Sequence, residues 1–390
     1  MEKVFIVLEN GQVFEGKRFG YDGDVMGELV FTTSVVGYIE TLTDPSYYGQ
    51  IVMQTFPLIG NYGWIGSDVV SEKIYASAYI VREWCEKPSN FRCERDVDAE
   101  LKARKVVGVC GVDTRMLTRI IRENGVMNAC ITSDPKKVDK KALKAYGVKN
   151  AVAEIGSGEA EYKAENEKYK VTLINYGSLM NLPAALNARD CTVKVVPYNT
   201  SAEAVLKDEP DAIVLSGGPG DPAENAACIE EIKKLHGKKP IFGAGLGHQM
   251  LALAMGAKTE KLKYGHRGGN QPVKDLSTGR IYISSQNHGY TVVNDTVEAV
   301  GGRLTFVNGN DGTCEGVEYP KAKAFSALLR QDKILDHGKG QDYRGAQHEK
   351  RCKLFVCRHR ALRAAAHKLQ IYRHAGAGQH KVSAHHAPAP

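Results

Sequence analysis

The 390-residue sequence contains no run of about 18 apolar residues, the length that a membrane-spanning helix needs. It begins with a strand-like run, Met1 to Leu8, that has none of the features of a secretory signal peptide. Its composition, 43% hydrophobic and 25% charged, is ordinary for a globular protein. We therefore expect a cytoplasmic protein with no membrane partner.

Paired cysteines are also missing. The nine cysteines are scattered along the chain and form no CxxC pair, which argues against both a zinc ribbon and a disulfide framework. We expect most of them to be small buried residues in a reducing compartment. We predict no metal site in this chain.

An excess of basic charge is absent from most of the sequence, although the formal net charge is +7. Residues 327–390 contain 13 Lys/Arg and 4 Asp/Glu, whereas the preceding residues contain 39 and 41. Nucleic-acid binding leaves an electrostatic footprint of clustered basic residues. Because the excess lies in the last segment alone, the rest of the chain offers no electrostatic case for DNA or RNA, and we predict no nucleic-acid partner.

Two patterns divide the chain into two predicted domains, for which its length suffices. Residues 1–150 alternate strand-like runs with turns rich in Gly, Asp and Asn, and a helix is predicted over 113–124. The apolar stripe of that helix is interpreted as core, and its arginines as a solvent- or partner-facing edge. Residues 151–168 are polar and rich in Glu, Lys and Gly, which is typical of a linker.

From residue 169 strands and helices alternate at short spacing. We predict strands over 171–175, 193–196 and 212–215, with helices over 181–189, 201–208 and 225–235. This alternation favours an α/β domain, a parallel sheet flanked by helices. Ligands bind such sheets at the carboxyl ends of the strands, where glycine-rich loops occur at 216–222 and 243–247. By itself, the first of these loops is equally consistent with an ordinary turn.

The second loop has the layout of a nucleophile elbow. The apolar pair Ile241–Phe242 predicts a strand, three glycines predict a sharp turn, and a helical pattern runs on from Gln249. In an elbow the central residue is held at a strained backbone angle with its side chain exposed. Here the central residue is Gly245, which has no side chain that could act as a nucleophile.

This elbow resembles that of class I glutamine amidotransferases, whose pattern is Gly-x-Cys-x-Gly-x-Gln. Over about residues 3–326 the chain is similar to the small, glutamine-hydrolysing subunit of carbamoyl-phosphate synthetase. The first 150 residues match this subunit specifically, which disfavours a different amidotransferase. Further motifs that carry the resemblance are Thr43–Tyr47, Gly111–Arg115, Ser216–Pro222, Gly265–Asn270 and Ser285–Tyr290.

The resemblance implies an N-terminal mixed α/β domain (1–150), a linker (151–168) and a glutamine amidotransferase domain (169–326). In this family the small subunit hydrolyses glutamine and passes ammonia to a large subunit. The large subunit uses ATP, Mg²⁺ and bicarbonate to make carbamoyl phosphate for arginine and pyrimidine biosynthesis. The implied partners are that large subunit and L-glutamine, and no cofactor is expected in this chain.

The resemblance also implies residue roles. Gly218 and Gly220 are expected to contact glutamine, and the amides of their loop and of Leu246 to form an oxyanion hole. Other contacts are implied for the helix residue Gln249, for the loop residues Asn287, Gly289 and Tyr290, and for Ser46 of the N-terminal domain.

The chain departs from the family pattern at two places. Gly245 replaces the nucleophilic Cys, and Ala327–Asp332 stands where a His-Pro-Glu segment is expected. His288 does not substitute for the lost base, because its neighbours match a substrate-binding loop. We therefore predict a pseudoenzyme that can bind glutamine but has lost glutaminase activity. The alternative is a structural or regulatory partner of the large subunit that turns over no ligand.

The last segment, residues 327–390, departs from the family altogether and contains 8 of the 12 histidines. Three interpretations are open: a basic arm that binds nucleic acid or a membrane, a His-rich metal tract, and a frameshifted C-terminus. We favour the frameshift, because the codons of Ile334–His337 can encode Pro-Gly-Pro in another frame. That tripeptide often follows the base segment in this family. A frameshift would leave the amidotransferase domain incomplete and less stable.

The frameshift predicts a feature of the coding DNA. We expect Pro-Gly-Pro across the codons of Ile334–His337 in a second reading frame that stays open, and nucleotide sequencing of the gene checks this. A second frame interrupted by stop codons around that point would rule the frameshift out.

Overall fold

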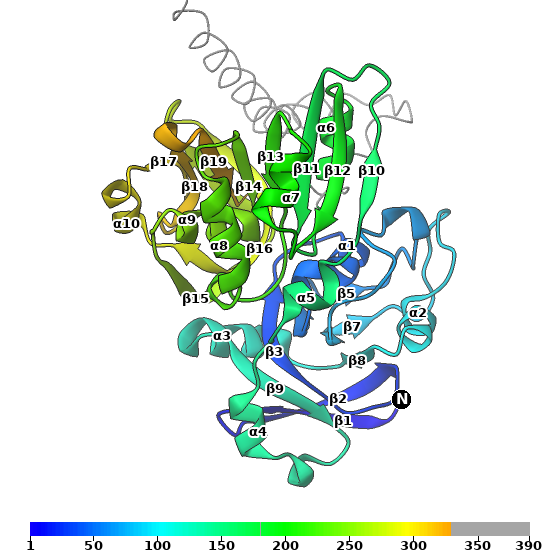
Figure 1. The fold of residues 1–390 in the computed structure, drawn as a ribbon. Coiled ribbons are helices and arrows are strands. Elements are labelled where there is room, and N and C mark those ends of the chain that lie inside the picture. Colours follow the sequence, from blue (N-terminus) through cyan, green and yellow to red (C-terminus); the bar gives the residue numbers. More distant parts are fainter. Residues whose placement is uncertain (180, 329–390) are drawn as a thin grey trace, which may run out of the picture.

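The computed structural model describes residues 1–179 and 181–328. The described chain forms a closed barrel followed by a ten-stranded sheet (Figure 1). This arrangement agrees with the predicted mixed α/β fold. The predictions for the last segment concern residues that lie almost entirely outside the described part.

The barrel closes in the strand order β1-β2-β8-β6-β4-β3-β9. It is filled by apolar side chains such as Ile6, Leu29 and Ile131, each fully buried. A separate pair of short strands, β5 (Leu58–Ile59) and β7 (Glu83–Trp84), lies outside it. The barrel strands are β1 (Lys3–Leu8), β2 (Val13–Gly20), β3 (Val25–Thr32), β4 (Gln50–Gln54), β6 (Ala78–Ile80), β8 (Val107–Cys110) and β9 (Met127–Thr132).

Four helices accompany the barrel: α1 (Tyr38–Thr43), α2 (Val97–Ala103), α3 (Thr114–Asn124) and α4 (Lys140–Ala145). Asp113 caps α3 by accepting a hydrogen bond from the amide of Met116. The predicted stripe of α3 is buried in the barrel core, and its arginines are exposed, as predicted. One of them, Arg122, lies over the ring of Tyr264 in the second sheet, 5.8 Å from its centroid.

The second sheet has the order β10-β12-β11-β13-β14-β19-β18-β17-β15-β16. Its strands are β10 (Ala160–Tyr162), β11 (Tyr169–Asn175), β12 (Cys191–Pro197), β13 (Ala212–Leu215), β14 (Ile241–Ala244), β15 (Thr259–Asp275), β16 (Ile281–Val292), β17 (Arg303–Asn308), β18 (Cys314–Tyr319) and β19 (Ala324–Ala327). Its helices are α5 (Ala151–Ile155), α6 (Leu182–Asn187), α7 (Ala202–Lys207), α8 (Ala226–Leu235), α9 (Leu246–Ala254) and α10 (Asn294–Ala299).

The predicted parallel sheet is confirmed for five neighbouring strands, β12, β11, β13, β14 and β19. Alternate residues of β13 point to opposite faces: Ile213 packs in the core beneath α7, α8 and α9, and Val214 in the core beneath α6. The antiparallel extension β18-β17-β15-β16 was not predicted. Its long β15–β16 hairpin is rich in Gly and polar residues, which do not follow the apolar pattern of a parallel strand.

The stretch 151–168 suggested a linker, but it contains α5 and the strand β10, which pairs with β12 and forms one edge of the sheet. All three residues of β10 are exposed. A solvent-facing edge strand needs no apolar residues, and this explains why its composition resembled that of a linker.

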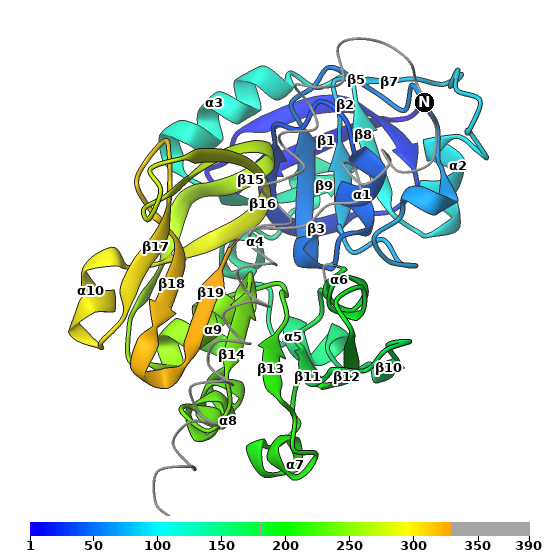
Figure 2. The ribbon, with the colours of Figure 1, turned by 90° about the horizontal axis from the view of Figure 1, so that it is seen from above.

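The two parts of the fold pack against each other. Figure 2 shows the β15–β16 hairpin lying against the barrel, with α3 beside β15. The amide of Val126 donates to the carbonyl of Lys263 at 2.7 Å, and Lys261 forms an ion pair with Glu28 at 2.6 Å. The carboxyl ends of the parallel strands therefore face the barrel rather than open solvent.

Seven of the nine cysteines lie in the described residues, all as free thiols, and five of these are buried. This agrees with their predicted role as small core residues. Among the described helices, none has the length and hydropathy needed to cross a bilayer.

Candidate functional site

The elbow has the predicted strand–turn–helix geometry. Gly245 lies between β14 and α9 with φ 55° and ψ −117°, a conformation that residues with a Cβ rarely adopt. A Cβ on Gly247 would lie 2.5 Å from the carbonyl oxygen of Leu215, and one on Gly243 would lie 2.7 Å from that of Gly247. The flanking glycines therefore permit a backbone approach that no larger residue allows.

Hydrogen bonds hold the elbow to both neighbouring strands. The amide of Gly245 donates to the carbonyl of Ala327 at 3.0 Å, and the amide of Gly247 donates to that of Ser216 at 3.0 Å. Beneath the turn, His248 Nδ1 lies 2.7 Å from Ser326 Oγ, and both residues are buried. Burial lowers the pKa of His248 to about 3, so this histidine is neutral and anchors the turn.

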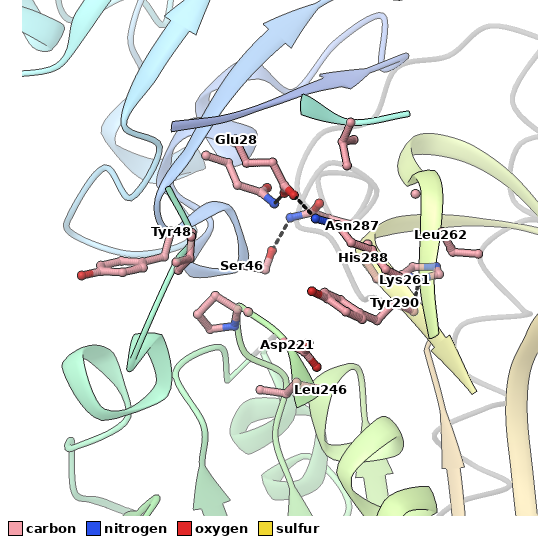
Figure 3. A pocket seen from close by; sticks show the side chains of 18 of the residues that line it. Glu28, Ser46, Tyr48, Asp221, Leu246, Lys261, Leu262, Asn287, His288 and Tyr290 are labelled. Carbon is pink, nitrogen blue, oxygen red and sulfur yellow. Dashed lines mark hydrogen bonds and ion pairs between the residues drawn. The ribbon is translucent and has the colours of Figure 1, made fainter. Parts of the chain in front are cut away.

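A pocket of about 350 Å³ lies above the elbow, between the barrel and the second sheet. Figure 3 shows Ser46 pointing across it towards Asn287, from the opposite domain. Asn287 Nδ2 donates to Ser46 Oγ at 2.7 Å, and that hydroxyl donates to Asp44 Oδ1 at 2.8 Å. A volume of this size is at the lower end of the range for small-molecule sites.

All nine residues singled out from the sequence line this one pocket, and they come from both domains. Gln249 in α9 is also bound to β16, because its Nε2 donates to the carbonyl of Tyr290 at 2.6 Å. The nine are Ser46, Gly218, Gly220, Gly245, Leu246, Gln249, Asn287, Gly289 and Tyr290. Their roles in binding glutamine stay predictions.

Backbone amides supply the polar groups near the elbow. Leu246 is the first residue of α9, where helix N–H groups lack partners within the helix and carry partial positive charge. A Cβ on Gly218 would lie 2.2 Å from the carbonyl oxygen of Tyr176, and Gly220 has φ +88°. Only glycine fits both positions. Backbone N–H groups in such positions can stabilise the negative charge that develops on a carbonyl oxygen. Gly245, however, offers no side chain that could attack the carbonyl carbon.

The segment that follows β19 reaches the same pocket. β19 runs parallel to β14 with Ala327 opposite Ala244, which brings the next residue, Leu328, to the pocket wall. The resemblance expected the catalytic base near this point. Leu328 is apolar and only 2% exposed, and residues 329–332 lie outside the described part.

Sequence reasoning missed other pocket residues, including Glu28, Tyr48 and Asp221. Burial, followed by the charge of Asp221, raises the pKa of Tyr290, so its hydroxyl stays protonated. Glu28 lies in a barrel strand and reaches the pocket only because the second domain packs there. Asp221 lies in the loop 216–222 that the sequence marked, whereas no local sequence signal marks Glu28 as a pocket residue.

Comparisons with known proteins agree with the two-part organisation. Residues 6–131 match the family model described as carbamoyl-phosphate synthase small chain, CPSase domain. Residues 172–328 match that of glutamine amidotransferase class-I.

Individual relatives cover most of the chain. The carbamoyl phosphate synthase small chain of Clostridium perfringens is 47% identical over 334 residues, 85% of this chain and 94% of the relative. That of Fusobacterium nucleatum is 45% identical over 329 residues, 84% of this chain and 92% of the relative. A solved glutamine amidotransferase from Thermotoga maritima is 18% identical with a TM-score of 0.36, and covers 53% of this chain and 97% of its own.

The elbow geometry predicts a position-specific effect of adding one methyl group. Gly247→Ala should lower the free energy of unfolding by about 1–3 kcal/mol, because the new Cβ collides with the backbone of Leu215. Urea unfolding monitored by circular dichroism measures this.

Gly147→Ala is the matched control, since a Cβ there meets no atom within 4 Å. The control should change stability by less than about 0.5 kcal/mol. Equal effects of the two substitutions would mean that close packing at the elbow is unimportant.

Proposed function

This chain belongs to the carbamoyl-phosphate synthase small-chain family, and from that membership we propose that it binds glutamine without hydrolysing it. One observation supports the proposal above all. The residues that the resemblance assigned to glutamine line one pocket, and the elbow beneath that pocket presents Gly245. The scaffold for binding is therefore retained where the reacting group is missing.

Amide hydrolysis at such an elbow needs covalent chemistry. A thiolate attacks the carboxamide carbon, a base and acid move protons, and ammonia leaves to give a thioester that water then hydrolyses. Gly245 has no side chain, so no bond to the carboxamide carbon can form at this residue. The oxyanion donors then have no covalent intermediate to stabilise, and most of the rate is lost.

Glutamine binding, unlike hydrolysis, requires neither a nucleophile nor a base. We propose that the amides of Leu246 and of the Gly218 loop receive the carboxamide oxygen of glutamine. Asn287 and Ser46 close the pocket from opposite domains and contact the amino-acid end. Gly245 does not destabilise the elbow, because glycine adopts this backbone conformation without strain.

The proposed partner is the large subunit of carbamoyl-phosphate synthetase, which would use ATP, Mg²⁺ and bicarbonate while this chain carries no cofactor. In such a complex the present chain would support synthesis from free ammonia, for arginine and pyrimidine biosynthesis. The exposed arginines of α3 offer one candidate contact surface for that partner.

Loss of the nucleophile predicts which nitrogen source can be used. Mixed with a matching large subunit, this chain should give carbamoyl phosphate with ammonium but not with glutamine. Coupling the product to citrulline formation measures the rate with each nitrogen source.

The control replaces this chain by the Clostridium perfringens relative on the same large subunit, which verifies that the assay detects glutamine-derived ammonia. Turnover of glutamine by the present chain above the rate of the large subunit alone would show that another residue attacks the amide.

Glutamine binding itself is tested by calorimetry. Asn287→Ala should weaken glutamine binding about 5- to 150-fold, because the loss of a hydrogen bond from this pocket residue to the ligand would cost about 1–3 kcal/mol.

Asn294→Ala is the control, since Asn294 lies outside the pocket and bonds only to the carbonyl of Gly312. No heat of glutamine binding by the unsubstituted chain would favour the alternative, a structural or regulatory partner without a ligand.

A further inference from the structure

Two histidines and a glutamate converge beside the pocket, from three strands of the antiparallel extension. His266 Nδ1 lies 3.2 Å from His288 Nε2 and 3.4 Å from Glu315 Oε1, and His288 Nε2 lies 3.9 Å from the same carboxylate oxygen. Glu315 is fully buried, and the side chains of the two histidines are 9% and 8% exposed. Water therefore has little access to these groups.

In each ring, the nitrogen that points away from the cluster has a hydrogen-bond partner, and this partner determines which nitrogen carries the proton. His266 Nε2 lies 2.8 Å from Asp311 Oδ2, and His288 Nδ1 lies 2.8 Å from the carbonyl oxygen of Tyr290. Both partners only accept hydrogen bonds, so each of these nitrogens carries the proton. In the neutral rings, the lone pairs of His266 Nδ1 and His288 Nε2 then face each other and the carboxylate.

A fourth acceptor joins them. Gln286 Nε2 donates to Glu315 Oε2 at 2.8 Å, which fixes the orientation of the amide. Its carbonyl oxygen Oε1 consequently lies 3.2 Å from His288 Nε2. A cation among four buried acceptors that converge in this way would relieve their mutual repulsion.

The spacing fits a metal ion. Ligand atoms of a tetrahedral Zn²⁺ site lie about 3.4 Å apart, because Zn–N and Zn–O bonds measure about 2.0–2.2 Å. A triangle with the three measured sides has a circumradius of about 2 Å, so one point lies at bonding distance from all three atoms.

The surroundings fit as well. Ligating histidines commonly donate their other N–H to a carboxylate or a backbone carbonyl, and Asp311 and the carbonyl of Tyr290 occupy those places. Asn308 Nδ2 donates to Glu315 Oε1 at 3.2 Å and helps to orient the carboxylate; the same nitrogen lies 3.4 Å from His266 Nδ1.

We propose that His266, His288 and Glu315 form a Zn²⁺ site, with the carbonyl oxygen of Gln286 at the fourth position. Two imidazoles and a carboxylate are a ligand set that zinc accepts. His288 lies between Asn287 and Gly289, so the ion would hold the pocket-lining part of β16 in place. This site is structural and independent of whether glutamine binds.

The test compares the zinc content of two variants of the full chain. Each is stripped with a chelator, reloaded with Zn²⁺, freed of excess ion and analysed by mass spectrometry for zinc. His266→Gln should hold one zinc per chain fewer than His236→Gln, whose substituted residue is exposed at the C-terminal cap of α8 and belongs to none of the cluster's strands. The histidines of residues 327–390 are present in both variants and contribute equally.

Diffraction at the zinc absorption edge tests the unsubstituted chain, so a folding defect in a variant cannot affect the result. An anomalous peak about 2 Å from the three ligand atoms is the expected result. Equal zinc content in both variants, or zinc-soaked crystals without a peak there, would overturn the site. Neither measurement involves glutamine, so a negative zinc result would not argue against the proposed function.

Discussion

The site depends on the close approach of backbones where β14 turns into α9. Gly247 lets this turn pack closely against β13, and Gly243 lets β14 lie close to the start of α9. The amides of Gly245 and Gly247 fasten the turn to Ala327 of β19 and to Ser216, the residue after β13. This packing places Leu246, the first residue of α9, in the wall of the pocket. The backbone amide that α9 offers to a ligand's polar end follows from that placement.

Ligand binding and amide hydrolysis depend on different features of such a turn. Binding needs the backbone geometry, which is built by β13, β14, β19 and the glycines around the elbow. Chemistry needs one side chain at the centre of the turn, and Gly245 lacks it. Glycine is also the residue that best tolerates the elbow's dihedral angles. Glycine at the centre of the turn is therefore compatible with an intact fold, as the proposed binding without turnover requires.

The pocket is also a product of domain packing. Ser46 comes from the barrel and Asn287 from the second sheet, and they meet at 2.7 Å. The β15–β16 hairpin that carries Asn287 is held against the barrel by the Lys261–Glu28 ion pair and by backbone hydrogen bonds. The same hairpin carries two of the three proposed zinc ligands. An ion there would stiffen the wall of the pocket that faces the barrel.

The sequence by itself determined the features that depend on local patterns. The strand–helix alternation, the helix predicted over 113–124 and the elbow with Gly245 at its centre can all be read within a few neighbouring residues. The resemblance added the residues of the pocket, because its motifs mark them one by one. Only the tertiary structure decided how these motifs meet. It assigned residues 151–168 partly to an edge strand and brought Glu28 to the pocket. It also gathered His266, His288 and Glu315, which lie on three different strands, into one buried cluster. Contacts between residues far apart in the chain arise from sheet pairing and domain packing, and no local pattern encodes them.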